Sequence, residues 1–110
     1  MNEKEELIQS MIQELRRGTV VLCVLSQLSK PCYGYTLVKN LEELGIAVDT
    51  NTLYPLLRRL EKQKLLFSEW ETEGNKPRKY YRRTLLGDEI YQSLSKQWRI
   101  MSAHMEEMLK

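Results

Sequence analysis

The sequence is poor in the residues that build catalytic, metal and disulfide sites. Among its 110 residues are two cysteines and one histidine. Cys23 and Cys32 lie nine residues apart with no histidine nearby, which is not the spacing of zinc ligands. His104 has no general base beside it in the sequence, and there is no glycine-rich phosphate loop. We therefore expect no enzymatic activity, no metal site and no cofactor.

Long apolar runs are also missing. The longest, Val20 to Leu25, is far too short to cross a bilayer, and the first residues are acidic and polar, unlike a signal peptide. A cytoplasmic protein without a membrane partner is therefore expected. Cys23 lies in an apolar helical run and is expected to pack as a small hydrophobe. We interpret Cys32 as an ordinary loop residue, with redox sensing as the alternative.

The net charge is only +2, but it is unevenly distributed. Residues 51–83 contain nine Lys and Arg against four acids, which gives +5, whereas the remainder contains eight basic and eleven acidic residues, which gives −3. A basic middle on a slightly acidic frame is typical of nucleic-acid binders. A solvated charged surface explains the charge alone equally well.

Apolar residues recur at helical spacing in several parts of the chain. The pattern predicts helices over residues 7–15, 20–28, 33–44, 51–64 and from Thr84 to the C-terminus. Gly18 breaks or weakens the first helix, and Gly45 suits a left-handed cap after the third. Asn51 or Thr52 is expected to cap the fourth helix, which places Pro55 in or next to its first turn.

Two short segments around a turn complete the expected fold. Residues 65–72 and 78–84 flank Gly74-Asn75-Lys76-Pro77, which predicts a β-hairpin. The fold class is therefore mainly α with a small β-hairpin: a winged helix-turn-helix plus a C-terminal dimerisation helix. We assign residues 1–84 to the DNA-binding domain with its N-terminal helix, and residues 85–110 to the dimerisation helix.

The segment Asn51–Glu61 carries the most information. Leu53, Leu56, Leu57 and Leu60 form one apolar stripe of a helix. The opposite face mixes hydrogen-bonding groups with cations and therefore suits the major groove of DNA. Arg59, on that face, can instead pair with nearby acids.

The hairpin and the start of the third helix add further candidates for DNA contact. Cations next to the turn should project furthest and neutralise phosphates, although a charged hairpin can also serve to block edge-to-edge aggregation. The free N–H groups at the start of the third helix could bind a phosphate together with two tyrosines, of which we expect at least one to pack in the core. The predicted DNA-binding residues are Tyr33, Tyr35, Asn51, Thr52, Tyr54, Arg58, Lys62, Lys76, Arg78 and Lys79.

The last helix has an apolar seam with heptad spacing, which predicts a homodimer. Residues of the first helix are expected to contribute, although packing of the two helices within one chain is the alternative. The predicted interface residues are Leu7, Met11, Leu15, Tyr91, Leu94, Trp98, Met101, Met105 and Met108. Trp98 and Met101 could also form a pocket for a small aromatic effector, because aromatic and thioether surfaces adapt to flat apolar ligands.

Several of these segments together resemble the PadR family of bacterial transcriptional regulators, in its compact form with a single C-terminal helix. The matching stretches are Arg16–Thr19, Tyr33–Tyr35, Thr52–Glu61, Lys76–Arg82 and Leu86-Gly87, with Trp98 further along the last helix. The resemblance implies a winged-helix homodimer that represses promoters and is released by an effector. In some members the tryptophan that corresponds to Trp98 stacks on drugs or phenolic compounds. The chain departs from many members at Asn51, where they carry glycine or glutamate.

The sequence thus favours a sequence-specific regulator that binds an inverted repeat in double-stranded DNA as a homodimer, and the resemblance implies that it is a repressor. The alternative is a coiled-coil interaction module whose basic hairpin binds an acidic partner without DNA specificity.

Overall fold

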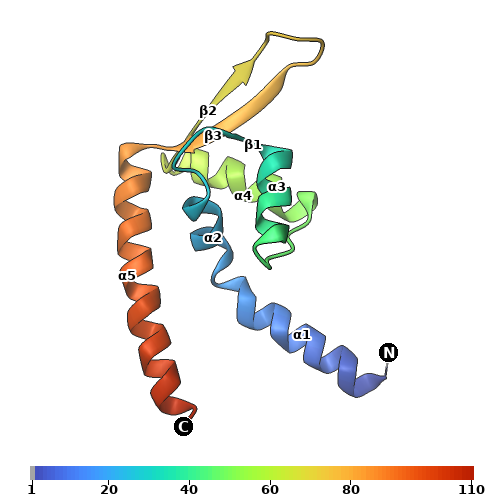
Figure 1. The fold of residues 1–110 in the computed structure, drawn as a ribbon, viewed down its shortest axis with the longest axis vertical. Coiled ribbons are helices and arrows are strands. Elements are labelled where there is room, and N and C mark those ends of the chain that lie inside the picture. Colours follow the sequence, from blue (N-terminus) through green and yellow to red (C-terminus); the bar gives the residue numbers. More distant parts are fainter. Residues whose placement is uncertain (1) are drawn as a thin grey trace.

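The computed structural model describes residues 2–110. Its elements are α1 (Glu3–Arg17), α2 (Val20–Ser26), β1 (Cys32–Tyr33), α3 (Gly34–Glu43), α4 (Thr50–Lys62), β2 (Leu66–Glu71), β3 (Arg78–Arg83) and α5 (Leu85–Met108). Helices α2, α3 and α4 form a small bundle, and the hairpin β2–β3, here called the wing, projects from one end of it (Figure 1). No helix within residues 2–110 is long and apolar enough to cross a membrane. The expected class, mainly helical with a small β-hairpin, is confirmed.

The core lies where α2, α3 and α4 meet the base of the hairpin. Its members are buried aliphatic side chains and one tyrosine: Val24, Leu25, Leu28, Leu37, Leu41, Leu53, Leu57, Leu60, Leu66 and Tyr81. Each fully buried leucine contributes roughly 1.5–3 kcal/mol relative to an exposed one. The leucine stripe of α4 faces this core, so its opposite face is directed outward. The aromatic residue that completes the core is Tyr81 rather than Tyr33 or Tyr35, which corrects our expectation for those two.

The sheet has three strands in the order β1-β3-β2, all antiparallel. β1 was not predicted, because a two-residue strand has no periodicity of its own and exists only through its pairing with β3. Cys32 pairs with Tyr81 and Tyr33 with Tyr80. Cys32 is therefore a strand residue rather than a loop residue, and α3 begins at Gly34 rather than Tyr33. Burial raises the pKa of the Cys32 thiol, which lowers its reactive thiolate fraction and argues against redox sensing.

Helix α4 begins at Thr50, one residue before the range 51–64 that the sequence pattern predicts. Its N-cap is Asp49, whose Oδ1 accepts a hydrogen bond from the N–H of Thr52 at 2.8 Å. Asn51 and Thr52 are thus helical residues, and the prediction that one of them is the cap is wrong. Pro55 consequently lies in the second turn, where it removes the hydrogen bond to the carbonyl of Asn51. Both residues are exposed, so water can reach that carbonyl.

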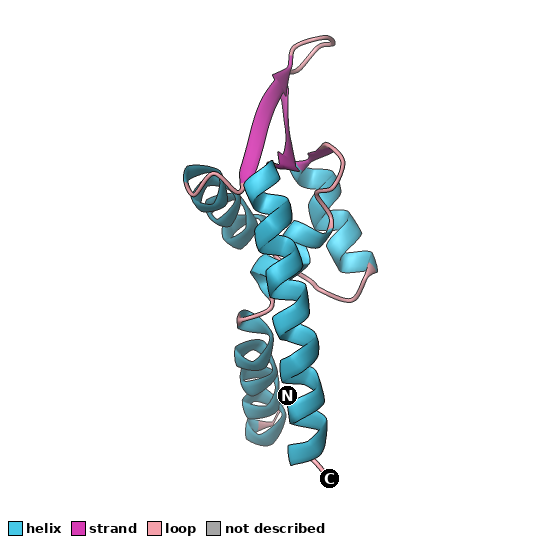
Figure 2. Cartoon of the chain, turned by 90° about the vertical axis from the view of Figure 1, so that its left-hand side faces the viewer, coloured by secondary structure: helices cyan, strands magenta, loops and turns pink. Residues whose placement is uncertain are grey.

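Helix α5 is attached to the base of the hairpin by its first turn. Thr84 is its N-cap, as predicted, and the Thr84 hydroxyl accepts from the N–H of Gly87 at 2.9 Å. A side chain at Gly87 would collide with the carbonyl oxygen of Leu65, so the helix lies directly against the chain that leads into β2. From there α5 runs past the bundle, away from the wing (Figure 2).

Helices α1 and α5 both extend beyond the bundle on the side opposite the wing and diverge from one another (Figure 1). Helix α1 has no buried residue. The alternative in which the last helix packs against the first within one chain is therefore not what the structure shows.

Candidate nucleic-acid interface

The outward face of α4 presents hydrogen-bonding and cationic side chains to solvent. Asn51, Thr52, Arg58, Arg59 and Lys62 are all exposed. Within residues 2–110 neither arginine takes part in an ion pair, so the expectation that Arg59 pairs with an acid is not met. The cations of this face are therefore available to a ligand that comes from outside the chain.

Tyr54, predicted on the same face, is placed differently. It is half-buried, and it packs against the core cluster. Its ring fills the space beside Gly34, where a Cβ would lie 2.5 Å from Tyr54 Cε1 and 2.8 Å from the hydroxyl oxygen. Tyr54 therefore joins α4 to the start of α3, and only part of its ring can be reached from outside.

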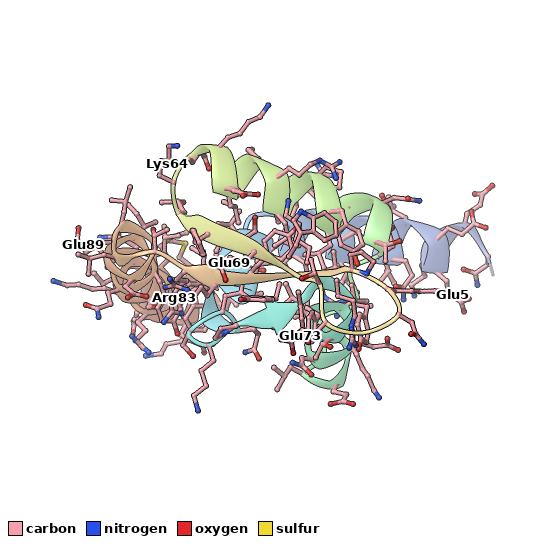
Figure 3. The ribbon with its side chains drawn as sticks, turned by 90° about the horizontal axis from the view of Figure 1, so that it is seen from above. Glu5, Lys64, Glu69, Glu73, Arg83 and Glu89 are labelled. Carbon is pink, nitrogen blue, oxygen red and sulfur yellow. The ribbon has the colours of Figure 1, made fainter. Side chains whose placement is uncertain are left out.

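The wing lies between α4 and α3. Viewed from above, α4 lies on one side of the wing and α3 on the other (Figure 3). Because side chains alternate along a strand, neighbouring residues of β3 face different helices. Arg78 faces the start of α3, whereas Lys79 faces α4.

Arg78 lies against two tyrosines at the start of α3: Tyr33, which is the N-cap residue, and Tyr35, which is the second residue of the helix. Its guanidinium lies 4.8 Å above the Tyr33 ring, and its Nη1 donates to the Tyr35 hydroxyl at 3.2 Å. The two tyrosine rings are stacked with their centroids 6.1 Å apart. Tyr33 donates a hydrogen bond to the Glu71 carboxylate, so its ring is fixed from the wing side as well. Arg78 is exposed and begins β3 next to the turn, as the sequence suggested, but its side chain lies against Tyr33 and Tyr35 instead of projecting freely.

Lys79 has an internal partner. Its Nζ lies 3.6 Å from Glu61 Oε1 on α4, and 5.9 Å and 5.6 Å from the ring centroids of Trp70 and Tyr81. The expectation that Lys79 projects outward with its neighbours is therefore wrong, because the alternation of β3 turns it toward α4. Lys76, in the turn, is exposed.

A hollow of about 250 Å³ lies where α3, α4 and the wing come together. Its lining is aromatic and cationic: Tyr33, Gly34, Tyr35, Tyr54, Trp70, Arg78, Lys79 and Tyr81. Trp70 is 62% exposed, an unusual position for a large aromatic side chain in a small protein. Sequence reasoning missed it. The register of β2 could have identified it, since Trp70 alternates with Leu66 and Ser68 on the side that faces α4.

The outer side of the wing contains acids that are already engaged. Besides the bond from Tyr33 to Glu71, the Tyr80 hydroxyl donates to Glu69 at 2.5 Å. This hydrogen bond to a carboxylate is the main reason that the pKa of Tyr80 is raised. Of the four acids in residues 51–83, Glu69 and Glu71 are thus bonded to tyrosine hydroxyls, and Glu61 is paired with Lys79.

The predicted dimer seam divides into two parts. Tyr91 and Leu94 are half-buried against the core of their own chain. The remaining predicted residues are exposed apolar side chains: Leu7, Met11, Leu15, Trp98, Met101, Met105 and Met108. Trp98 lines two hollows of about 390 and 380 Å³, one beside Cys23 and Arg99 and the other beside Leu15 and Met101.

Comparison with known proteins identifies the family. A family model described as the Transcriptional regulator PadR-like family matches residues 21–93. The chain belongs to the PadR-like family. A transcriptional regulator from Mycobacterium tuberculosis is 35% identical over 77 residues, which are 69% of this chain and 72% of that protein.

Solved structures agree with this PadR-like assignment. A PadR family transcriptional regulator from Eggerthella lenta is 50% identical, covers 97% of this chain and 96% of its own, and superimposes with a TM-score of 0.92. A PadR-like transcriptional regulator from Bacillus cereus is 29% identical, covers 88% and 97%, and gives a TM-score of 0.80. The protein is thus a winged-helix transcriptional regulator of the PadR-like family, which implies DNA binding.

Proposed function

We propose that this PadR-like regulator binds an inverted-repeat operator as a homodimer and represses transcription, with α4 in the major groove and the wing beside it. The observation that carries the proposal is the outward face of α4, where Thr52 and Arg58 are exposed and Arg58 has no acidic partner within residues 2–110. Arginine can bond guanine O6 and N7 together, and threonine can bond base edges or phosphates.

The surface beside α4 suits the phosphate backbone. α3 has no side-chain cap, and the N–H groups at the start of a helix favour an anion. The Tyr35 hydroxyl accepts from Arg78 and can still donate its own proton to a phosphate oxygen. Lys76 in the turn would neutralise a further phosphate. These contacts supply affinity and register, whereas sequence selection is left to Thr52, Arg58 and the exposed part of Tyr54.

The homodimer is supported by the apolar side chains that α1 and α5 leave exposed. Burying a side chain such as Trp98 or Met101 is worth roughly 1.5–3 kcal/mol, and several together can exceed the roughly 4–15 kcal/mol that association costs. A two-fold axis near α5 would place two α4 helices about one DNA turn apart, roughly 34 Å. That arrangement matches an inverted repeat.

A small aromatic effector is a second part of the proposal. Trp98 is partly exposed and lines both hollows beside α5, so a planar ligand could stack on it. Binding there would alter the packing of the proposed dimer and release the operator. Removing the second tryptophan with Trp70→Phe isolates the Trp98 fluorescence. Saturable quenching by planar aromatics that is weakened in Met101→Glu, a variant that keeps the fluorophore but changes the lining, supports the pocket. Quenching that never saturates counts against it.

The experiment that tests the main proposal is selection of binding sites from random duplex DNA, followed by sedimentation of the complex. We expect enrichment of an inverted repeat bound by two chains, and repression of transcription when that repeat overlaps a promoter. The competing interaction module without DNA specificity predicts that no sequence is enriched. A monomer at micromolar concentration, or an enriched site without symmetry, would contradict the homodimer.

A further inference from the structure

Arg83 lies where the wing, α2 and α5 meet. Its Nε is 2.8 Å from Asp88 Oδ1, and its Nη1 donates to the carbonyl of Leu25 at 2.6 Å. The guanidinium carbon lies 4.2 Å from the centroid of the Tyr91 ring. The backbone N–H of Arg83 donates to the carbonyl of Leu28 at 2.8 Å. Arg83, which is labelled in Figure 3, is thus bonded to Leu25 and Leu28 on the side of the bundle and to Asp88 on α5.

The burial of this cation sets it apart from the other arginines of the wing. Its side chain is only 11% exposed. Removing a guanidinium from water raises the free energy of the folded state unless its donors are bonded. An apolar side chain of similar volume would fill the same space without this desolvation penalty. The directional contacts of the arginine therefore call for a role beyond packing, and each of them fixes an orientation as well as a distance.

These contacts set the direction in which α5 leaves the bundle. Thr84 and Gly87 fix where the helix begins, because one caps it and the other lies against Leu65. Asp88 and Tyr91 lie about one turn apart on one side of α5, and Arg83 contacts both. Beyond the first turn, Tyr91 and Leu94 also pack against the core. Apolar packing sets no single angle, whereas the bonds from Arg83 to Asp88 and to the Leu25 carbonyl are directional.

We propose that Arg83 is a positioning residue that holds α5 at a fixed angle to the winged helix and thereby sets the half-site spacing that the dimer accepts. The inference rests on the proposed homodimer and inverted repeat. At ~1.5 Å per residue, the 24 residues of α5 span about 36 Å, so a tilt of about 10° at the start of the helix moves its far end by about 6 Å. That displacement corresponds to roughly two base pairs of DNA at 3.4 Å each.

The test uses duplexes built from the half-site selected from random DNA, arranged as inverted repeats whose spacing changes by one base pair, together with a single half-site. Wild type and Arg83→Gln are compared with Arg82→Gln, which removes the same charge from the next residue. Arg82 is exposed and faces the other side of the sheet, 4.9 Å above the Phe67 ring. It therefore reports the general effect of losing one cation.

We expect wild type and Arg82→Gln to prefer the same spacing. In Arg83→Gln, the ratio of the affinities for the preferred and the other spacings should fall on the order of tenfold, the equivalent of one charged hydrogen bond. Its affinity for the single half-site should equal that of Arg82→Gln. Asp88→Asn should broaden the spacing profile in the same way. Arg83→Lys, which keeps the charge but cannot reach both partners, provides a milder variant if the glutamine variant does not fold.

An unchanged spacing profile in the folded Arg83 and Asp88 variants would overturn the inference. So would an equal loss of affinity for every duplex including the half-site, since that is what simple loss of stability produces. A wild-type protein without any spacing preference would overturn the proposed homodimer as well, whereas a preference that survives in Arg83→Gln overturns only the positioning role.

Discussion

The ring of Tyr54 lies where the side chain of residue 34 would be. A Cβ on Gly34 would approach Tyr54 Cε1 to 2.5 Å and its hydroxyl oxygen to 2.8 Å. Gly34 is the first residue of α3, and Tyr54 comes from α4. The absence of one side chain therefore allows the two helices of the DNA-binding unit to approach closely.

Gly34→Ala should lower the free energy of unfolding by about 1–3 kcal/mol, the usual cost of overpacking. The direction of this change in stability is informative, because alanine is otherwise favoured over glycine in a helix by about 1 kcal/mol. Urea unfolding followed by circular dichroism measures the effect. Gly18→Ala is the control, since a Cβ there meets nothing within 4 Å and the φ angle of −70° is ordinary.

The clash should depend on the ring. In a Tyr54→Leu background, Gly34→Ala should cost clearly less than in the wild type, which a double-mutant cycle detects as coupling. If Gly34→Ala is as harmless as Gly18→Ala, the close packing of α3 on α4 is not as described.

The part of this arrangement that local sequence determines could be predicted, and the part that depends on partners could not. The leucine stripe specified which face of α4 is buried, and Gly45 and Thr84 marked helix ends through their own chemistry. β1 was missed because it depends on pairing with β3, which lies forty-nine residues away along the chain at the pair Cys32 and Tyr81.

The same distinction applies to the candidate site. Thr52 and Arg58 were placed correctly on an exposed face because helical periodicity is a local property. Lys79 was expected to project outward because it is charged and close to a turn, but its direction depends on Glu61 and Trp70, which other elements contribute. Arg83 was seen only as part of a basic run, since its partners come from α2 and α5.

Tyr81 should make the protein sensitive to alkaline pH. Burial is the main reason that its pKa is raised, with Glu61 adding to the effect. A raised pKa in the folded state means that stability is fully present below the ordinary tyrosine value of about 10 and is lost as pH rises through the folded-state value. Tyr81→Phe should therefore lose less unfolding free energy than wild type as the pH rises above about 10. Tyr35→Phe, which changes an exposed tyrosine, is the control. If the unfolding free energy depends on pH equally in all three proteins, the effect of burial is refuted.

Neighbouring cations of the wing should differ in their contribution to DNA binding. Arg78→Ala should lower the dependence of log K on log salt by about one unit, because a phosphate contact is lost. Lys79→Ala should change the slope less, since Lys79 already neutralises Glu61. Titrations at several salt concentrations measure both slopes, and a larger change for Lys79→Ala would reverse the assignment.

A charge in the exposed seam should weaken the proposed dimer. Met105→Glu should raise the dimer Kd by at least about tenfold, since each copy loses burial worth roughly 1.5–3 kcal/mol. Gln92→Glu adds the same charge at another exposed position of α5 and should have little effect. Sedimentation equilibrium distinguishes them, and equal Kd values would show that the seam is not the interface.

The most direct test of the whole account is the affinity of Arg58→Ala for the duplex selected by the wild-type protein. Lys96→Ala is the control, because it removes the same charge from an exposed position on α5. Fluorescence anisotropy should show a loss of about 1–3 kcal/mol for Arg58→Ala, with relaxed preference at one base pair, and little change for Lys96→Ala. Wild-type affinity and specificity in Arg58→Ala would contradict the claim that the outward face of α4 reads DNA.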